Sequence, residues 1–157
     1  MGSMEVGILD AYLRFRKQVL EYSNVDMNLK IENDEQVYIA VFDVPIDSNI
    51  MGADTQTYAL VFGLNTHVYF RTGDVLTGLE KKGNVMKAMQ SLLISSHQVL
   101  GKMQLTQNIE FYESRNIRAY LKTRKGIFFK ELIGDCREDK FLIMLLKNLQ
   151  KEISEVL

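Results

Sequence analysis

The amino-acid sequence predicts an α+β domain in which three helices are combined with an antiparallel sheet of about five to seven strands. Two observations support this prediction. Segments with apolar–polar alternation, typical of strands, occur in two groups, and segments with an apolar repeat of three to four residues, typical of helices, flank both groups. The expected order is α-β-β-β-β-α-β-β(-β)-α, in which most strands follow one another directly and pair antiparallel.

Length and composition indicate one globular domain. The chain has 157 residues, of which 46% are apolar and 25% charged, as in a folded protein rather than a disordered one. We expect the domain to span residues 4–157, because residues 1–3, MGS before a second methionine, look like a remnant of cloning.

Hydropathy and cysteine content predict a soluble, cytoplasmic protein with no membrane partner. The longest apolar run, FLIMLL at residues 141–146, is far shorter than the stretch of about 20 residues that crosses a bilayer. Residues 1–17 lack the apolar core of a signal peptide. The single cysteine, Cys136, excludes an internal disulfide and fits a reducing compartment.

The first half of the chain predicts one helix followed by four strands. The helix is indicated by an apolar stripe: Ile8, Tyr12, Phe15, Val19 and Tyr22. Residues 27–31 alternate as a half-buried strand, and residues 37–44 are apolar on both faces, as in a central strand that ends at Pro45. A long loop over residues 43–57 precedes two further strands, TYALVFG and HVYFRTG.

The second half predicts a helix, two or three strands and a closing helix. Asn84 is expected to cap a helix that runs to Met103, and a strand is expected from Ile109. Asp135 and Glu138 form a capping pair for the last helix. The face of that helix toward the core is expected to be Leu142, Leu145, Leu149, Ile153 and Val156.

Residues 113–131, ESRNIRAYLKTRKGIFFKE, predict a β-hairpin with concentrated positive charge. Basic residues occur there with no acid between them: Arg115, Arg118, Lys122, Arg124, Lys125 and Lys130. A three-residue loop over 124–126 is expected, since Gly126 suits a positive φ, and it sets Tyr120 opposite Lys130. One exposed face then carries Arg118, Tyr120, Lys122, Phe128 and Lys130.

Three interpretations of this basic and aromatic face are open. It could stack bases and neutralise phosphates, as in single-strand binders. It could contact another protein, or it could be a solvated face on which basic side chains cover aromatic rings. A net charge of -1 is unusual for a chain whose main role is to bind phosphates, and no known nucleic-acid motif accompanies the hairpin.

Two other features favour a protein partner. The long loop contains the apolar Ile46, Ile50 and Met51 among polar residues. The last helix carries apolar Phe141, Ile143, Leu146 and Leu157 outside its main stripe, which predicts self-association through helix surfaces. The side chains expected to bind a partner are Arg118, Tyr120, Lys122, Arg124, Lys125, Phe128, Lys130, Ile46, Ile50 and Met51.

No catalytic, cofactor-binding or metal-ligating residue is expected. Gly73 and Gly78 have the spacing of a phosphate loop, but Glu80 stands where the loop needs a cation or hydroxyl. His67 and His97 are too far apart in the chain for a common metal motif. Acidic neighbours of Cys136 oppose a reactive thiolate.

The element order resembles the small secretion-chaperone and YbjN-like fold group, and similar orders occur in small bacterial immunity and inhibitor proteins. The missing catalytic constellation and the surplus apolar and aromatic surface predict a non-enzymatic protein-binding domain that self-associates through helix surfaces. The resemblance implies that it is chaperone-, inhibitor- or immunity-like. The alternative is a nucleic-acid-binding module that uses the hairpin at residues 115–130.

Overall fold

The computed structural model describes residues 2–46, 54–62, 65–70 and 75–156. It confirms the predicted α+β class with three α-helices and an antiparallel sheet. The helices are α1 (Gly2–Glu21), α2 (Gly83–Ser95) and α3 (Arg137–Val156), with 3₁₀ turns η1 (Leu79–Lys81) and η2 (Ser96–Lys102) on either side of α2. The strands are β1 (Ile39–Ile46), β2 (Asp54–Val61), β3 (Asn65–Phe70), β4 (Val75–Leu76), β5 (Gln104–Thr106), β6 (Ile117–Thr123) and β7 (Gly126–Leu132).

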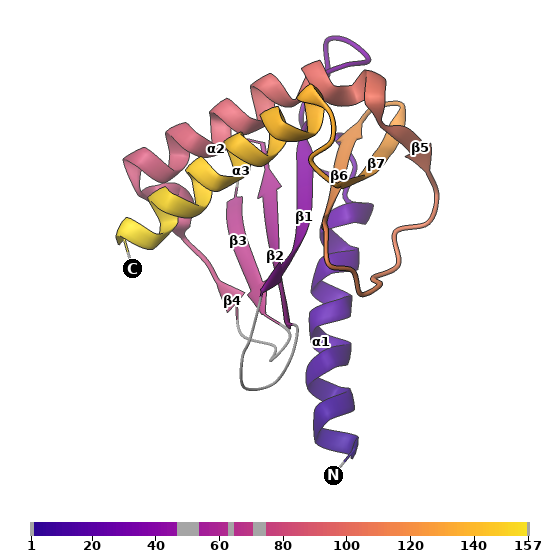
Figure 1. The fold of residues 1–157 in the computed structure, drawn as a ribbon, viewed down its shortest axis with the longest axis vertical. Helices are drawn as coiled ribbons and strands as arrows, with labels where there is room; N and C mark the ends of the chain where they lie inside the picture. The colour runs from indigo at the N-terminus through magenta and orange to yellow at the C-terminus, as the bar shows by residue number, and fades with distance from the viewer. Residues whose placement is uncertain (1, 47–53, 63–64, 71–74, 157) are drawn as a thin grey trace.

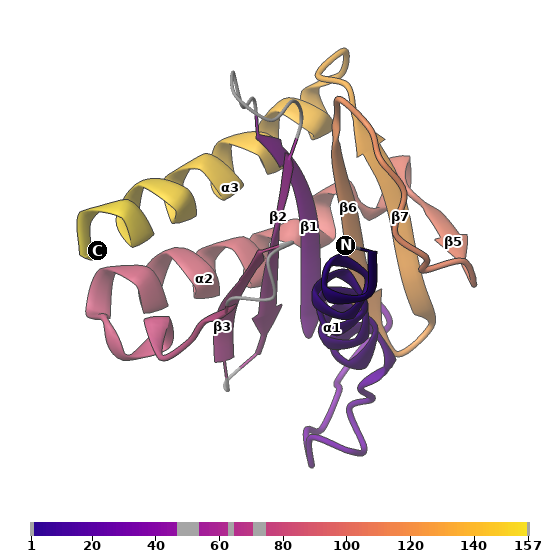
Figure 2. The same cartoon turned by 90° about the horizontal axis from the view of Figure 1, so that it is seen from below.

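The sheet has the strand order β4-β3-β2-β1-β6-β7-β5, and every neighbouring pair is antiparallel. The central strand β1 is buried on both faces over Ile39–Val44, as its continuous apolar sequence predicts. Helices α2 and α3 lie side by side on one face of the sheet, and α1 lies on the other (Figures 1 and 2). The protein therefore has three layers, with one apolar core on each side of the sheet.

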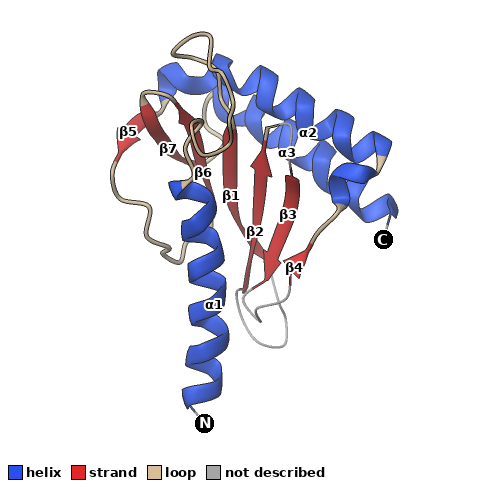
Figure 3. Cartoon of the chain, turned by 180° about the vertical axis from the view of Figure 1, so that it is seen from behind, coloured by secondary structure: helices blue, strands red, loops and turns tan. Residues whose placement is uncertain are grey.

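Helix α1 contacts the sheet through its C-terminal part. Tyr12, Val19 and Leu20 of this part are buried against β1, β2 and β6. The N-terminal part of α1 extends beyond the ends of the strands (Figures 1 and 3). The other end is fixed by Lys122 of β6, whose ammonium donates hydrogen bonds to the carbonyls of Leu20 (2.8 Å) and Tyr22. A cation at these carbonyls satisfies the end of the helix and complements its dipole.

The predicted strand over residues 27–31 is wrong. The chain turns there instead, with Met27 N–H donating to the Ser23 carbonyl and Leu29 N–H to the Asn24 carbonyl. Asn28 adopts a φ of 54°, which breaks an extended strand. The hydroxyl of Ser23 and the carboxylate of Asp26 also bind each other's backbone N–H. Local side-chain bonds of Ser, Asn and Asp thus outweigh the apolar alternation.

Pro45 does not end its strand. It lies within β1 and pairs with Thr55 of β2, whereas the pairing of β1 with β6 stops at Asp43. Beyond Asp43 this edge of β1 needs no backbone donor toward β6, so a proline is accommodated. The predicted loop is correspondingly shorter: Ile46 is the last residue of β1, while Ile50 and Met51 lie outside the described residues.

The segment after α2 also differs from expectation. A short strand, β5, pairs with Ile127–Phe129 of β7, and the strand expected from Ile109 is wrong. Residues 107–116 instead cross the α1 side of the sheet without strand pairing among the described residues, and we call them the strap. Helix α2 begins at Gly83 with Lys82 as its N-cap, two residues before the expected cap at Asn84.

Candidate protein-binding surface

The basic hairpin has a tighter turn than its sequence predicts. Thr123 pairs with Gly126, which leaves a two-residue loop, and the Thr123 hydroxyl accepts the N–H of Lys125 (3.1 Å). The predicted three-residue loop is therefore wrong by one residue of register. Tyr120 lies opposite Phe129, with ring centroids 4.9 Å apart, rather than opposite Lys130. This aromatic contact across the strands favours the observed register.

The shift of register separates the side chains that were expected to share one exposed face. Arg118, Tyr120 and Lys122 point toward α1, whereas Phe128 and Lys130 belong to the side covered by α2 and α3. Arg118 is 0% exposed and Tyr120 1% exposed, because α1 and the strap cover them. The expected face around Tyr120 is therefore not a surface of the protein.

The cations of the hairpin are used within the chain. Lys130 forms an ion pair with Asp139 of α3 (2.8 Å), Lys122 binds the end of α1, and the exposed Arg124 pairs with Asp34 (2.7 Å). Lys125 remains exposed at the loop. A nucleic-acid surface remains a prediction, but the continuous basic and aromatic patch that motivated it does not exist in the described residues.

Beneath α1 lies a buried polar network that the sequence interpretation missed. The Arg16 guanidinium forms an ion pair with the Asp43 carboxylate, with Nη2 2.8 Å from Oδ2 and Nε 3.1 Å from both oxygens. The Thr57 hydroxyl donates to Asp43 Oδ1 (2.7 Å), and the Tyr12 hydroxyl in turn donates to Thr57. All four side chains are buried, so the network joins α1 to β1 and β2.

The protonation of this network follows from its burial. Desolvation opposes the charge on Arg16, but the hydrogen bonds and charge of Asp43 outweigh it and raise the pKa of the guanidinium. Burial, together with the nearby Asp43 carboxylate, raises the pKa of the Tyr12 hydroxyl. Arg16 thus stays charged and Tyr12 stays neutral, so both donate hydrogen bonds.

The strap completes the enclosure of the two buried arginines. Arg16 donates to the carbonyl of Ile109, and Arg118 donates to the carbonyl of Tyr112. The ring of Phe111 lies between the guanidinium groups, 5.8 Å from Arg16 and 5.6 Å from Arg118. The strap is therefore held by two charged hydrogen bonds and by cation–π contacts.

The sequence did contain a signal for this network. Asp43 stands among the apolar residues of β1, at a position that faces α1 together with Ile39 and Val41. A buried carboxylate needs a cationic partner, and Arg16 lies one turn after Tyr12 on the face of α1 that meets the sheet. Opposite charges on the core-facing sides of α1 and β1 therefore predict that these two elements pack against each other.

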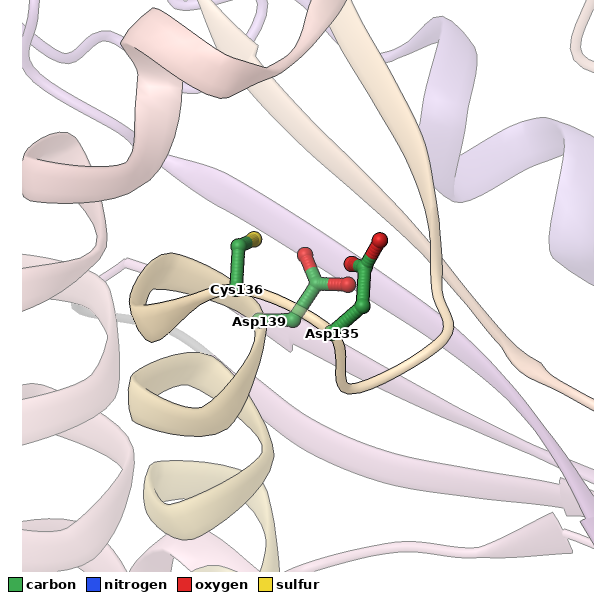
Figure 4. Close-up of side chains that lie close together, drawn as sticks. All are labelled: Asp135, Cys136 and Asp139. Carbon is green, nitrogen blue, oxygen red and sulfur yellow. The ribbon is translucent and has the colours of Figure 1, made fainter.

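A cluster of possible metal ligands at the start of α3 is a helix cap. Oxygen and sulfur atoms of Asp135, Cys136 and Asp139 lie within 4.8 Å of one another (Figure 4). However, the Asp139 carboxylate already accepts the backbone N–H groups of Ile133 (3.0 Å) and Gly134 (3.1 Å) and pairs with Lys130. The Lys130 ammonium thus already balances the charge of the Asp139 carboxylate, and this arrangement favours a structural role.

Apolar surface gathers instead along β7. Every residue of β7 before Leu132 is half-buried, because β5 covers it over only three residues. Three large apolar side chains beside it are exposed: Leu105 (54%), Tyr112 (39%) and Ile133 (57%). We call these three, with the half-buried Ile127, Phe128 and Phe129, the β7 edge surface. Of the residues predicted to bind a partner, Phe128 belongs to it.

The other predicted residues have separate positions. Ile46 is half-buried at the end of β1, and His67 is half-buried on β3, where burial lowers the pKa of its imidazole. The wide apolar face of α3 was expected to be a dimer surface. Phe141, Ile143 and Leu146 pack on the core beneath α3 instead, and Leu157 lies outside the described residues. Self-association stays a prediction.

Comparison of the chain with protein-family models, curated proteins and solved structures finds no match. The resemblance to secretion chaperones therefore stays a prediction from element order. Among the described residues, no helix has the length and apolar character required to cross a bilayer.

Proposed function

We propose that the protein acts without catalysis, by binding another protein through the β7 edge surface. The proposal rests on one observation, the exposure of Leu105, Tyr112 and Ile133 beside a half-buried strand at the end of the sheet. These side chains flank β7 on both faces of the sheet, since Leu105 lies beside Phe128 on the α2 and α3 side and Tyr112 contacts Phe129 on the α1 side. Exposed large apolar side chains around an open strand edge mark an interaction site. A chaperone-, inhibitor- or immunity-like role fits this mode of action.

The position of this surface suggests how a partner docks. The sheet ends at β5, and within the described residues the outer edge of Lys130–Leu132 has no strand beside it. An extended segment of a partner can add to such an edge through backbone hydrogen bonds, while its side chains contact flanking pockets. The exposed Leu105 and Ile133 lie at the two ends of this region and would contact alternate side chains of the segment.

The substitution Leu105→Asp is expected to reduce partner binding at least about tenfold, because it places a charge where the interface excludes water. Leu105 is exposed in the free protein, so the free energy of unfolding should change by about 0.5 kcal/mol or less. The measurement is quantitative capture of proteins from the source cells by immobilised protein, followed by the affinity of the captured partner.

Met144→Asp is the matched control, because Met144 is as exposed as Leu105 (55% against 54%) but lies on α3. The proposal is contradicted if both substitutions weaken binding equally, or if neither does. The same proposal includes self-association through the β7 edge surface rather than through α3, and sedimentation equilibrium of the purified protein measures it. If the captured partner proves to be a nucleic acid whose affinity falls steeply with salt, the alternative function replaces this one.

A further inference from the structure

A second site, which shares no residue with the β7 edge surface, lies between α1 and the strap. A cavity of about 260 Å³ opens there, lined by Leu13, Arg16, Lys17, Ile109, Glu110 and Phe111. Arg16 is 2% exposed and forms its inner wall, while Lys17 and Glu110 are exposed at the rim. Guanidinium, ammonium and apolar groups thus meet in one enclosed space.

The charges around this cavity favour an anion. The fully buried charged groups nearby are two guanidiniums, of Arg16 and Arg118, and one carboxylate, of Asp43. Glu131, opposite Arg118 on β7, is only half-buried and its carboxylate accepts the Ser114 hydroxyl. Arg118 does not line the cavity, but its Nε is buried with no hydrogen-bond partner among the described residues. The excess of buried positive charge attracts a negative group.

The other residues that line the cavity indicate the apolar character, the charge and the size of the ligand. Leu13, Ile109 and Phe111 supply half-buried apolar surface, which favours a ligand with an apolar body. Glu110 at the rim repels a second negative charge on the ligand. The cavity volume lies just below the range of about 300–1,000 Å³ of drug-sized pockets, so a single-ring molecule fits better than a peptide.

We propose that this cavity binds a small organic monocarboxylate. The carboxylate lies against Arg16 and Lys17, and the apolar body contacts Phe111 and the neighbouring aliphatic side chains. Because Arg16 also donates to the Ile109 carbonyl, a bound ligand adds contacts between α1 and the strap. The site shares no residue with the β7 edge surface, so the two proposals can fail separately.

The test uses benzoate as the probe and benzyl alcohol as its neutral counterpart, titrated into the ¹⁵N-labelled protein at constant ionic strength. Benzoate is expected to shift the amide signals of residues 13–17 and 109–111, and benzyl alcohol to bind at least about tenfold more weakly because it lacks the charged hydrogen bonds. Lys17→Gln should weaken benzoate binding about two- to fivefold, as an exposed ion pair allows. Leu13→Trp should abolish it by filling the cavity.

Arg14→Gln provides the matched control, because Arg14 is exposed on the same helix and carries the same charge but does not line the cavity. It should leave benzoate binding unchanged, as should Leu105→Asp. The proposal is overturned if benzoate does not bind, if benzyl alcohol binds equally well, or if Arg14→Gln weakens binding as much as Lys17→Gln. If Leu13→Trp fails to fold, the comparison of Lys17→Gln with Arg14→Gln still tests the proposal, because both substitutions change exposed side chains.

Discussion

Asp43→Ala is expected to lower the free energy of unfolding by about 3–5 kcal/mol, because it leaves the Arg16 guanidinium buried without its counter-charge. Arg16 and Asp43 are 2% and 0% exposed, so water cannot replace the lost carboxylate without opening the α1 interface. The Thr57 hydroxyl loses its acceptor as well. Urea unfolding followed by circular dichroism measures the effect.

The double variant Arg16→Met/Asp43→Leu separates the cost of an unpaired charge from the value of the pair. Replacing a buried ion pair by apolar side chains of similar volume is often neutral or stabilising. The double variant should therefore recover most of the stability that Asp43→Ala loses. A loss below about 1 kcal/mol in Asp43→Ala would show that α1 does not seal this network.

Asp139→Ala is expected to lower the free energy of unfolding by about 2–4 kcal/mol, the second largest effect. The carboxylate is 1% exposed and binds two backbone N–H groups at the β7–α3 junction as well as the Lys130 ammonium. Its removal leaves these donors without a partner at the start of α3. Thermal and urea unfolding of the variant measure the loss.

The Asp139 contribution should depend on pH in a defined direction. Burial acts to raise the pKa of this carboxyl, but the Lys130 and Gly134 hydrogen bonds outweigh it and lower the pKa. The stability difference between the protein and Asp139→Ala is thus fully present above the ordinary carboxyl pKa of about 3.9, and it falls as the pH drops below that value.

Asp135→Ala is the control for this site, because Asp135 belongs to the same cluster but is exposed. It should change the unfolding free energy by about 0.5 kcal/mol or less. Equal losses in the two variants would contradict the capping role given to Asp139.

The sequence predicts the architecture well because apolar periodicity decides it. The doubly apolar β1 occupies the core as expected, and so do Tyr12, Phe15 and Val19 of the α1 stripe and the α3 stripe from Leu142 to Ile153. Tyr22 and Val156, at the ends of the two predicted stripes, are exposed instead. The hairpin at residues 117–132 was also predicted, but not its register. A loop of two or three residues suits the same turn sequence, and the choice depends on packing between Tyr120 and Phe129 that no local pattern contains.

The candidate site was harder to predict because periodicity shows which residues share a face but not what covers it. Tyr120 does lie on the face of β6 opposite Leu121, as predicted, but α1 covers that face, so the prediction that it is exposed was wrong. The prediction assumed a sheet with one open face. Asp43 in an apolar strand and Arg16 in an amphipathic helix were the evidence against it, since each charge requires a buried partner.

The β7 edge surface depends on tertiary structure in the same way. Leu105 lies just after the helix predicted to run to Met103, and Ile133 lies just after the hairpin predicted over residues 113–131. Their exposure results from the shortness of β5, which pairs with only three residues of β7. The sequence alone does not predict how many residues of such a short edge strand pair with its neighbour.

Hydrogen–deuterium exchange with and without the captured partner tests the central claim most directly. Binding at the β7 edge surface predicts slower exchange at Gln104–Thr106 and at residues 130–133, where backbone amides gain partners, with little change in α2. Slower exchange confined to α1 or α2, with the amides of β5 and β7 unaffected, would contradict binding at this edge of the sheet.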